Sequence, residues 1–296
     1  MKKLATLILV LAVALNLAAC GGSGHAANPE SDFEYRYSEA NKGAMITKYV
    51  GTAADVYIPS ELGGQPVVAI DKGAFFESGI EYVYIPEGVK AMWNSAFAKS
   101  KKLRKVELPE SLMVIGANAF RECSGLAEVK IPKKSFLEIQ SCAFMDCKAL
   151  STLTFSQSYG VSMQAWAFRG CTSLREVTLD GNKMDGYIGM QAFRGCTSLA
   201  SFKVTGKVTY YNLAAQAFSG CSNLKNISLA NEVNVLTGAF DGLNAASVTY
   251  AGETCNAGDF KRYDEIPDVA QAALLINVIP ELEKITSDGL WPLDSD

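Results

Sequence analysis

Hydrophobic positions recur along most of the chain with a spacing of 22 to 25 residues. An Ala-Phe pair marks each period, an aliphatic residue or Met lies five positions before most of these Phe residues, and Cys or Ser lies three positions after them in seven copies. The octapeptide AFRGCTSL even occurs twice, at 167–174 and 192–199. A fixed period of this length is the signature of a stacked repeat architecture. The eight marker residues are Phe75, Phe97, Phe120, Phe144, Phe168, Phe193, Phe218 and Phe240.

An apolar-x-apolar triplet such as Val83-Tyr84-Ile85 completes each period, and this alternation predicts a short strand with one buried face. The pattern therefore predicts a β-rich leucine-rich-repeat solenoid, a curved right-handed superhelix with one short parallel strand per repeat. Rungs about 4.8 Å apart would bring equivalent residues into columns, so that Phe packs on Phe and Cys on Cys. Pro follows the early triplets and ends their strands, but the later units replace it with Ser156, Asp180, Thr205 and Ala230.

The first 19 residues have the composition of an export signal. Lys2 and Lys3 precede an apolar run over residues 4–15, which is too short to span a bilayer. The following LAACG stretch resembles the lipobox of bacterial lipoproteins, which implies that Cys20 carries a lipid and becomes the mature N-terminus; the alternative is an ordinary secretory signal that contains a Cys. Residues 20–32, rich in Gly, Ser and Asn, are predicted to be a flexible tether. We therefore expect an exported protein that is lipid-anchored to the bacterial membrane and displayed at the cell surface.

The predicted repeat domain spans residues 33–258, and residues 259–296 are predicted to be a C-terminal cap. Within that cap, VAQAALLINV at 269–278 follows a possible Asp N-cap and precedes Pro280, which indicates a helix that closes the open end of the solenoid. Nine acidic and three basic residues give the segment 259–296 a charge of -6. We expect its end to be an acidic tail.

Two stretches resemble the BspA-like leucine-rich-repeat family of bacterial surface proteins. They are AFRECSGLAEVKIP at 119–132 and the opening segment FEYRYSEANKGAMITKYVGTAADVYIPSELGGQPVVAIDKGAF at 33–75. The resemblance implies a two-stranded N-terminal β cap before the first full rung. It also implies a role in adhesion to host or matrix proteins.

Charge and chemistry argue against several other classes of function. The whole chain has a net charge of -4, and its repeat region is close to neutral, which disfavours nucleic acid as a partner. The basic run of Lys99, Lys101, Lys102, Arg104 and Lys105 is interpreted as a solvated turn, with a polyanion site as the alternative. The single histidine, His25, lies in the predicted tether, so no Ser-His or Cys-His pair and no His-based metal site is expected in the repeats. We predict no enzyme activity and no cofactor.

Cysteine positions disfavour a disulfide framework. The column cysteines are predicted to be buried free thiols that behave as small apolar side chains, since parallel side chains in a packed column would have to leave their rotamers to form a bond. They are Cys123, Cys147, Cys171, Cys196 and Cys221.

A ligand surface is predicted where outward positions of the triplet strands carry tyrosines next to alternating charges. Tyr is common at binding hot spots because it combines a large rigid area with a hydroxyl group, although it also simply favours strands. The candidate residues are Tyr57, Tyr82, Tyr84, Lys105, Glu107 and Lys130. The expected function is non-catalytic binding of an unidentified protein through the concave face, with host and matrix proteins as the candidates. The alternative is a carbohydrate-binding or envelope-scaffolding module.

Overall fold

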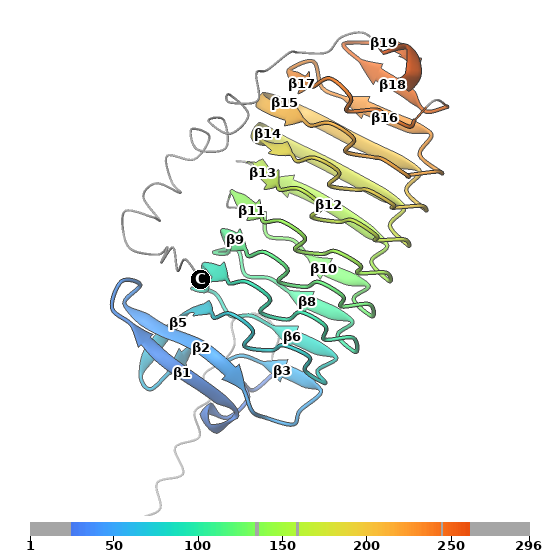
Figure 1. Ribbon diagram of the computed structural model, residues 1–296. Coiled ribbons are helices and arrows are strands. Elements are labelled where there is room, and N and C mark those ends of the chain that lie inside the picture. Colours follow the sequence, from blue (N-terminus) through green and yellow to red (C-terminus); the bar gives the residue numbers. More distant parts are fainter. Residues whose placement is uncertain (1–24, 134–135, 158–159, 244, 261–296) are drawn as a thin grey trace, which may run out of the picture.

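The repeats stack as the turns of a β-solenoid, in which each turn contributes a strand to each of two stacks (Figure 1). The structure is a computed structural model that describes residues 25–133, 136–157, 160–243 and 245–260. This architecture confirms the predicted solenoid. The predicted helix at 269–278 and the lipidation site at Cys20 lie outside the described residues.

The first stack contains the predicted triplet strands. Its strands pair in parallel and in register, so that Val56 lies beside Val83 and Val83 beside Val106. The stack consists of β3 (Asp55–Tyr57), β6 (Tyr82–Tyr84), β8 (Lys105–Glu107), β10 (Glu128–Lys130), β12 (Thr152–Gln157), the first parts of β14 (Glu176–Ile188) and β15 (Ser201–Leu213), β16 (Asn226–Leu229) and β18 (Ser247–Tyr250).

The second stack is built from the residues just before each Ala-Phe pair, where the sequence showed a lone aliphatic position. Most of the strands within the repeats are only two to four residues long, too short for a period-2 pattern to be visible, so the sequence indicated one strand per repeat where the structure has two. They are β2 (Gly43–Tyr49), β5 (Gln65–Ile70), β7 (Ala91–Met92), β9 (Val114–Ile115), β11 (Leu137–Ile139), β13 (Gly160–Met163), the second parts of β14 and β15, and β17 (Val233–Val235).

Antiparallel strands complete both ends of the described stack. At the start, η1 (Glu30–Asp32) leads into β1 (Phe33–Ser38), which pairs with β2, and β4 (Glu61–Leu62) pairs with β5. This is the expected two-stranded N-terminal cap. At the other end, β19 (Glu253–Asn256) pairs with β18 and is followed by η2 (Ala257–Asp259).

A ladder of aromatic rings runs through the core. The marker Phe residues are all buried, and successive rings stack with centroids 4.7 Å apart at Phe75–Phe97 and 5.8 Å apart at Phe193–Phe218. Tyr49 extends the ladder into the cap, with its ring 5.2 Å from Phe75. Because one ring per turn meets its own copy above and below, the Phe position tolerates little change along the sequence.

Proline placement divides the first stack into two regions. The strands that are followed by an apolar residue and Pro are three residues long and form a separate four-stranded sheet, β10-β8-β6-β3. In β14 and β15 the Pro is missing and the strand continues: each is 13 residues long and runs from the first stack into the second, whereas β16 ends at Leu229 although Ala230 stands in the Pro position. Proline lacks the N–H that a ladder needs, so its loss lets the strand extend. Among the described residues, β10 and β12 do not pair, and this break falls at the boundary between the two kinds of turn.

Candidate functional site

In each strand of the four-stranded sheet, the residues on either side of the central valine point outward. Val56, Val83 and Val106 at the strand centres are fully buried, which leaves the residue on each side to face away from the core. All six predicted surface residues belong to these four strands. The structure therefore brings the predicted residues together on one sheet.

Tyrosines form one half of this surface. The rings of Tyr57 and Tyr82 lie 5.3 Å apart and are tilted by 52°, and both side chains are half-buried. Tyr84 pairs with Tyr57 across the strands but is only 9% exposed, so it contributes little accessible area. Burial and the nearby Glu107 carboxylate raise the pKa of the Tyr82 hydroxyl above its usual value, so the hydroxyl remains a protonated hydrogen-bond donor even in mildly alkaline solution.

Paired charges form the other half. The Lys105 ammonium lies 3.2 Å from a Glu107 carboxylate oxygen and 3.4 Å from one of Glu128, and the Lys130 ammonium lies 3.9 Å from Glu107. A hydrogen bond to Glu107 is the main reason that the pKa of Lys105 is raised. Glu128 completes this network although it was not among the six candidates. Its outward position in the strand register was the signal for it.

The segment before the cap covers the edge of this sheet. The imidazole of His25 stacks on the Tyr57 ring at 4.7 Å, the Asn28 backbone N–H donates to the Tyr57 carbonyl at 2.9 Å, and the Asn28 side-chain oxygen accepts from the Tyr57 N–H at 2.7 Å. These residues belong to the predicted tether. Its polar composition resembles a linker, and no pattern in it showed that Asn28 satisfies the open edge of β3.

The surface offers binding groups rather than reactive ones. Within the described residues there is no group of three or more His, Cys, Asp or Glu side chains that could hold a metal ion. The column thiols are buried away from the sheet surface, and burial raises the pKa of Cys123, Cys147 and Cys171. The same part of the chain has no helix that is long and apolar enough to cross a membrane. Half-buried aromatic rings beside an ion-pair network are chemically suited to contact a macromolecular surface.

The two stacks of parallel strands, one turn per repeat, define a solenoid of the leucine-rich-repeat class, a class that is typically non-catalytic. The family model described as BspA type Leucine rich repeat region matches this chain in six copies over residues 68–184 and 138–259. The chain belongs to this family.

One solved structure supports the fold. A leucine-rich repeat protein from T. pallidum is 24% identical, with 86% of this chain and 97% of that chain covered and a TM-score of 0.50. A leucine rich cell surface protein from Faecalibacterium prausnitzii is 17% identical, with 78% of this chain and 96% of that chain covered and a TM-score of 0.38. A search of curated proteins found no match.

Proposed function

We propose that this protein is a non-catalytic adhesin or protein-binding module, and that the outward face of β3, β6, β8 and β10 is its docking surface. The observation that carries the proposal is the adjacency of the Tyr57–Tyr82 ring pair and the charge network centred on Lys105 and Glu107. A rigid aromatic pair offers apolar area at low entropic cost, and the network next to it supplies charges of both signs.

Charge pairing within the network also favours a protein partner. Lys105 and Glu107 are already oriented by each other and by their neighbours, so these side chains lose little conformational entropy when a partner binds. Alternating signs reject a uniformly charged polymer and select a partner with a matching pattern. The exposed charges at the edge of the patch, on Glu128 and Lys130, would govern the association rate more than the final affinity.

The docking surface is tested with the double variant Tyr57→Ser/Tyr82→Ser and a matched control, Thr178→Ser/Ser228→Ala, on later outward positions of the same stack. Surface plasmon resonance against a panel of purified extracellular-matrix proteins should find a partner for the wild type. Loss of the two aromatic rings should weaken the affinity for that partner about a hundredfold, since each ring contributes on the order of 1–2 kcal/mol of binding free energy. Equal affinity for both variants, with unchanged circular dichroism, would place the site elsewhere.

The same proposal includes export and a lipid anchor at Cys20. The LAACG stretch supports it, and two acyl chains would suffice for stable attachment where one is marginal. Cells expressing Cys20→Ala should release the protein from the membrane fraction, whereas wild type should stay in it. Quantitative membrane retention of the Cys20→Ala protein would contradict the anchor without touching the docking surface.

A further inference from the structure

The N-terminal cap leaves one side of the first repeat uncovered. Residues 50–54 connect β2 to β3, whereas residues 71–81 connect β5 to β6 and form the first complete Ala-Phe turn. The shorter connection covers only part of the turn beneath it. Tyr49 fills the position of the missing Phe, and its backbone N–H donates to the Ala74 carbonyl at 2.8 Å.

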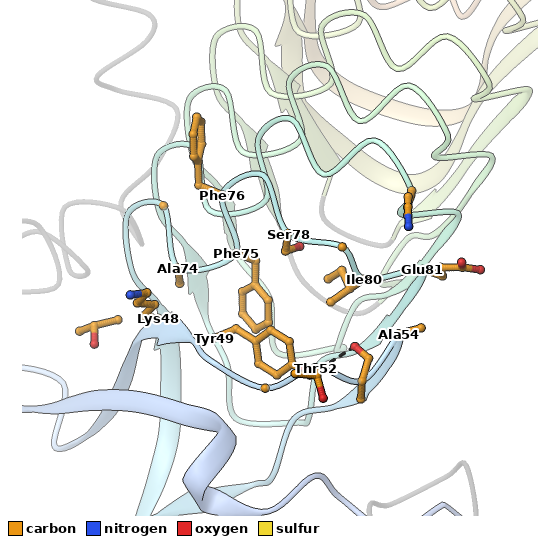
Figure 2. A pocket seen from close by; sticks show the side chains of 16 residues that line it. Lys48, Tyr49, Thr52, Ala54, Ala74, Phe75, Phe76, Ser78, Ile80 and Glu81 are labelled. Atoms are coloured by element: carbon orange, nitrogen blue, oxygen red, sulfur yellow. Dashed lines mark hydrogen bonds between the residues drawn. The ribbon is translucent and has the colours of Figure 1, made fainter.

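A groove of about 650 Å³ occupies the space of the missing turn (Figure 2). Tyr49, Phe75 and Ile80 form its floor, and Thr52 and Ser78 stand on opposite sides of it. Thr52 and Ser78 lie in connections between strands, and Tyr49 at the end of β2 already donates its backbone N–H to the Ala74 carbonyl. The groove is therefore bordered mainly by connecting segments, which disfavours β-strand addition as a binding mode.

Backbone groups of the groove are left for a ligand. In the turns marked by Phe97 to Phe218, the carbonyl of the residue after the marker Phe accepts a hydrogen bond from the turn before it, as the Ala98 carbonyl does from the Glu77 N–H at 2.9 Å. The equivalent carbonyl of Phe76 has no such donor among the described residues, and the N–H groups of Thr52 and Ala53 have no acceptor there. The groove thus offers backbone N–H donors, a backbone carbonyl acceptor and side-chain hydroxyl groups, which suits a polyhydroxylated ligand.

Lysines surround the groove. Lys48 and Lys102 line it, and a neighbouring hollow of about 430 Å³ is lined by Lys99, Lys101 and Lys102. The two lining acids are occupied: Glu77 lies 3.3 Å from Lys99, and Glu81 lies 3.6 Å from Arg104. For Lys48, Lys101 and Lys102 the described residues provide no ion-pair partner. The basic run interpreted from sequence as a solvated turn therefore frames a groove, with a local excess of positive charge on a chain of net charge -4.

We propose that this groove binds an acidic oligosaccharide. Carboxylate or sulfate groups on the sugar would pair with Lys101 and Lys102, and sugar hydroxyls would bond to Ser78 and to the open Phe76 carbonyl. Phe76, 46% exposed with the Lys99 ammonium 5.3 Å from its ring centre, offers an aromatic face on which a sugar ring can stack. This site is separate from the docking surface proposed for a protein partner.

The probe is a heparin-derived hexasaccharide, titrated calorimetrically at low and at physiological salt. The variant is Lys101→Ser/Lys102→Ser. Its matched control is Lys207→Ser/Lys225→Ser, which removes the same charge from exposed positions on later turns. Loss of the two exposed ion pairs between these lysines and the sugar should weaken the affinity about tenfold, while the affinity of the control stays within about twofold of the wild type. Binding should also weaken as salt rises.

Two further titrations make the outcome decisive. Phe76→Ser should weaken hexasaccharide binding with the lysines intact, and polyglutamate of equal charge should bind the wild type at least tenfold more weakly, because it lacks hydroxyls and ring faces. No hexasaccharide binding by the wild type, equal losses in variant and control, or equally tight binding of polyglutamate would each overturn the proposal. The Tyr57→Ser/Tyr82→Ser variant should still bind the hexasaccharide. Failure of the oligosaccharide proposal can therefore be distinguished from failure of the docking-surface proposal.

Discussion

Each column cysteine uses its thiol to join neighbouring turns. The Cys123 thiol donates to the Phe97 carbonyl at 3.0 Å, and the same bond recurs one turn at a time at Cys147, Cys171, Cys196 and Cys221. Ser100 makes the equivalent bond to the Phe75 carbonyl at 2.8 Å. The sequence correctly indicated a buried column, but the column is polar as well as small, and Ser100 was the residue that could have shown it.

These bonds predict strong protection of the column thiols. Burial raises the pKa of the Cys123 thiol to about 12, so almost no reactive thiolate forms at pH 8. In a Cys20→Ala protein treated with a thiol reagent, the half-buried Cys142 and Cys255 should react first. The five column cysteines should react only after denaturant is added, as followed by mass spectrometry. Rapid native labelling of Cys147 would contradict this arrangement.

At the scale of the element, the proline pattern decides where strands end. Asp180 stands where earlier turns carry Pro, and it lies inside β14 with Ser156 on one side and Thr205 on the other. Its carboxylate also accepts a hydrogen bond from the Thr205 hydroxyl at 3.0 Å. The later turns stack as expected, and in two of them the continuous strands β14 and β15 replace the corners that Pro forms in the early turns.

Replacement of Asp180 by Pro should therefore be costly. It removes a ladder donor from the middle of a long strand, and a loss of roughly 3 kcal/mol in the free energy of unfolding is expected. Asp180→Asn keeps the backbone N–H and should cost less than about 1 kcal/mol. The reverse change in an early turn, Pro109→Ala, should be similarly mild. Urea denaturation measures all three, and equal stability of Asp180→Pro and Asp180→Asn would show that the strand does not depend on this position.

A buried carboxyl on the second stack makes stability depend on pH. Glu138 in β11 is 7% exposed; one carboxyl oxygen accepts from the Gln164 side chain at 2.7 Å, and the other has no partner within the described residues. Desolvation raises the pKa of Glu138 above that of an unfolded Glu, about 4.3. The group therefore favours folding below about pH 4, and this contribution is lost as pH rises through the raised value.

Glu138→Gln should remove that dependence. At pH 7 its melting temperature should exceed that of the wild type, because no charge is buried, and the difference should shrink at pH 4. Glu128→Gln is the matched control on an exposed position that pairs with Lys105, and no such gain at pH 7 is expected from it. Differential scanning calorimetry at both pH values checks this. An identical gain for Glu138→Gln at pH 4 and pH 7 would point to packing rather than charge.

For the whole molecule, repetition made the architecture predictable. Eight copies of one pattern specified the Phe ladder, the buried triplets and the alignment of Tyr57, Tyr82, Lys105 and Glu107 on one sheet. What occurs once could not be recognised in this way. The docking of Asn28 on Tyr57 and the groove left by residues 50–54 depend on how unique segments meet the first turn, and a single sequence carries no periodic signal for either.

If Cys20 carries the proposed lipid, the docking of His25 and Asn28 on β3 limits how far the molecule can stand from a membrane. Four residues lie between Cys20 and His25, which stacks on Tyr57, and the five residue-to-residue steps of an extended chain span about 18 Å at most. With a lipid at Cys20, Tyr57 would therefore lie close to the lipid headgroups, and the membrane would sterically hinder a bulky partner from reaching it. A flexible insert of about 20 residues after Gly22 should increase capture of that partner on whole cells and leave its affinity for the detached protein unchanged. The short tether would then restrict binding on the cell to partners slender enough to reach the surface beside the membrane.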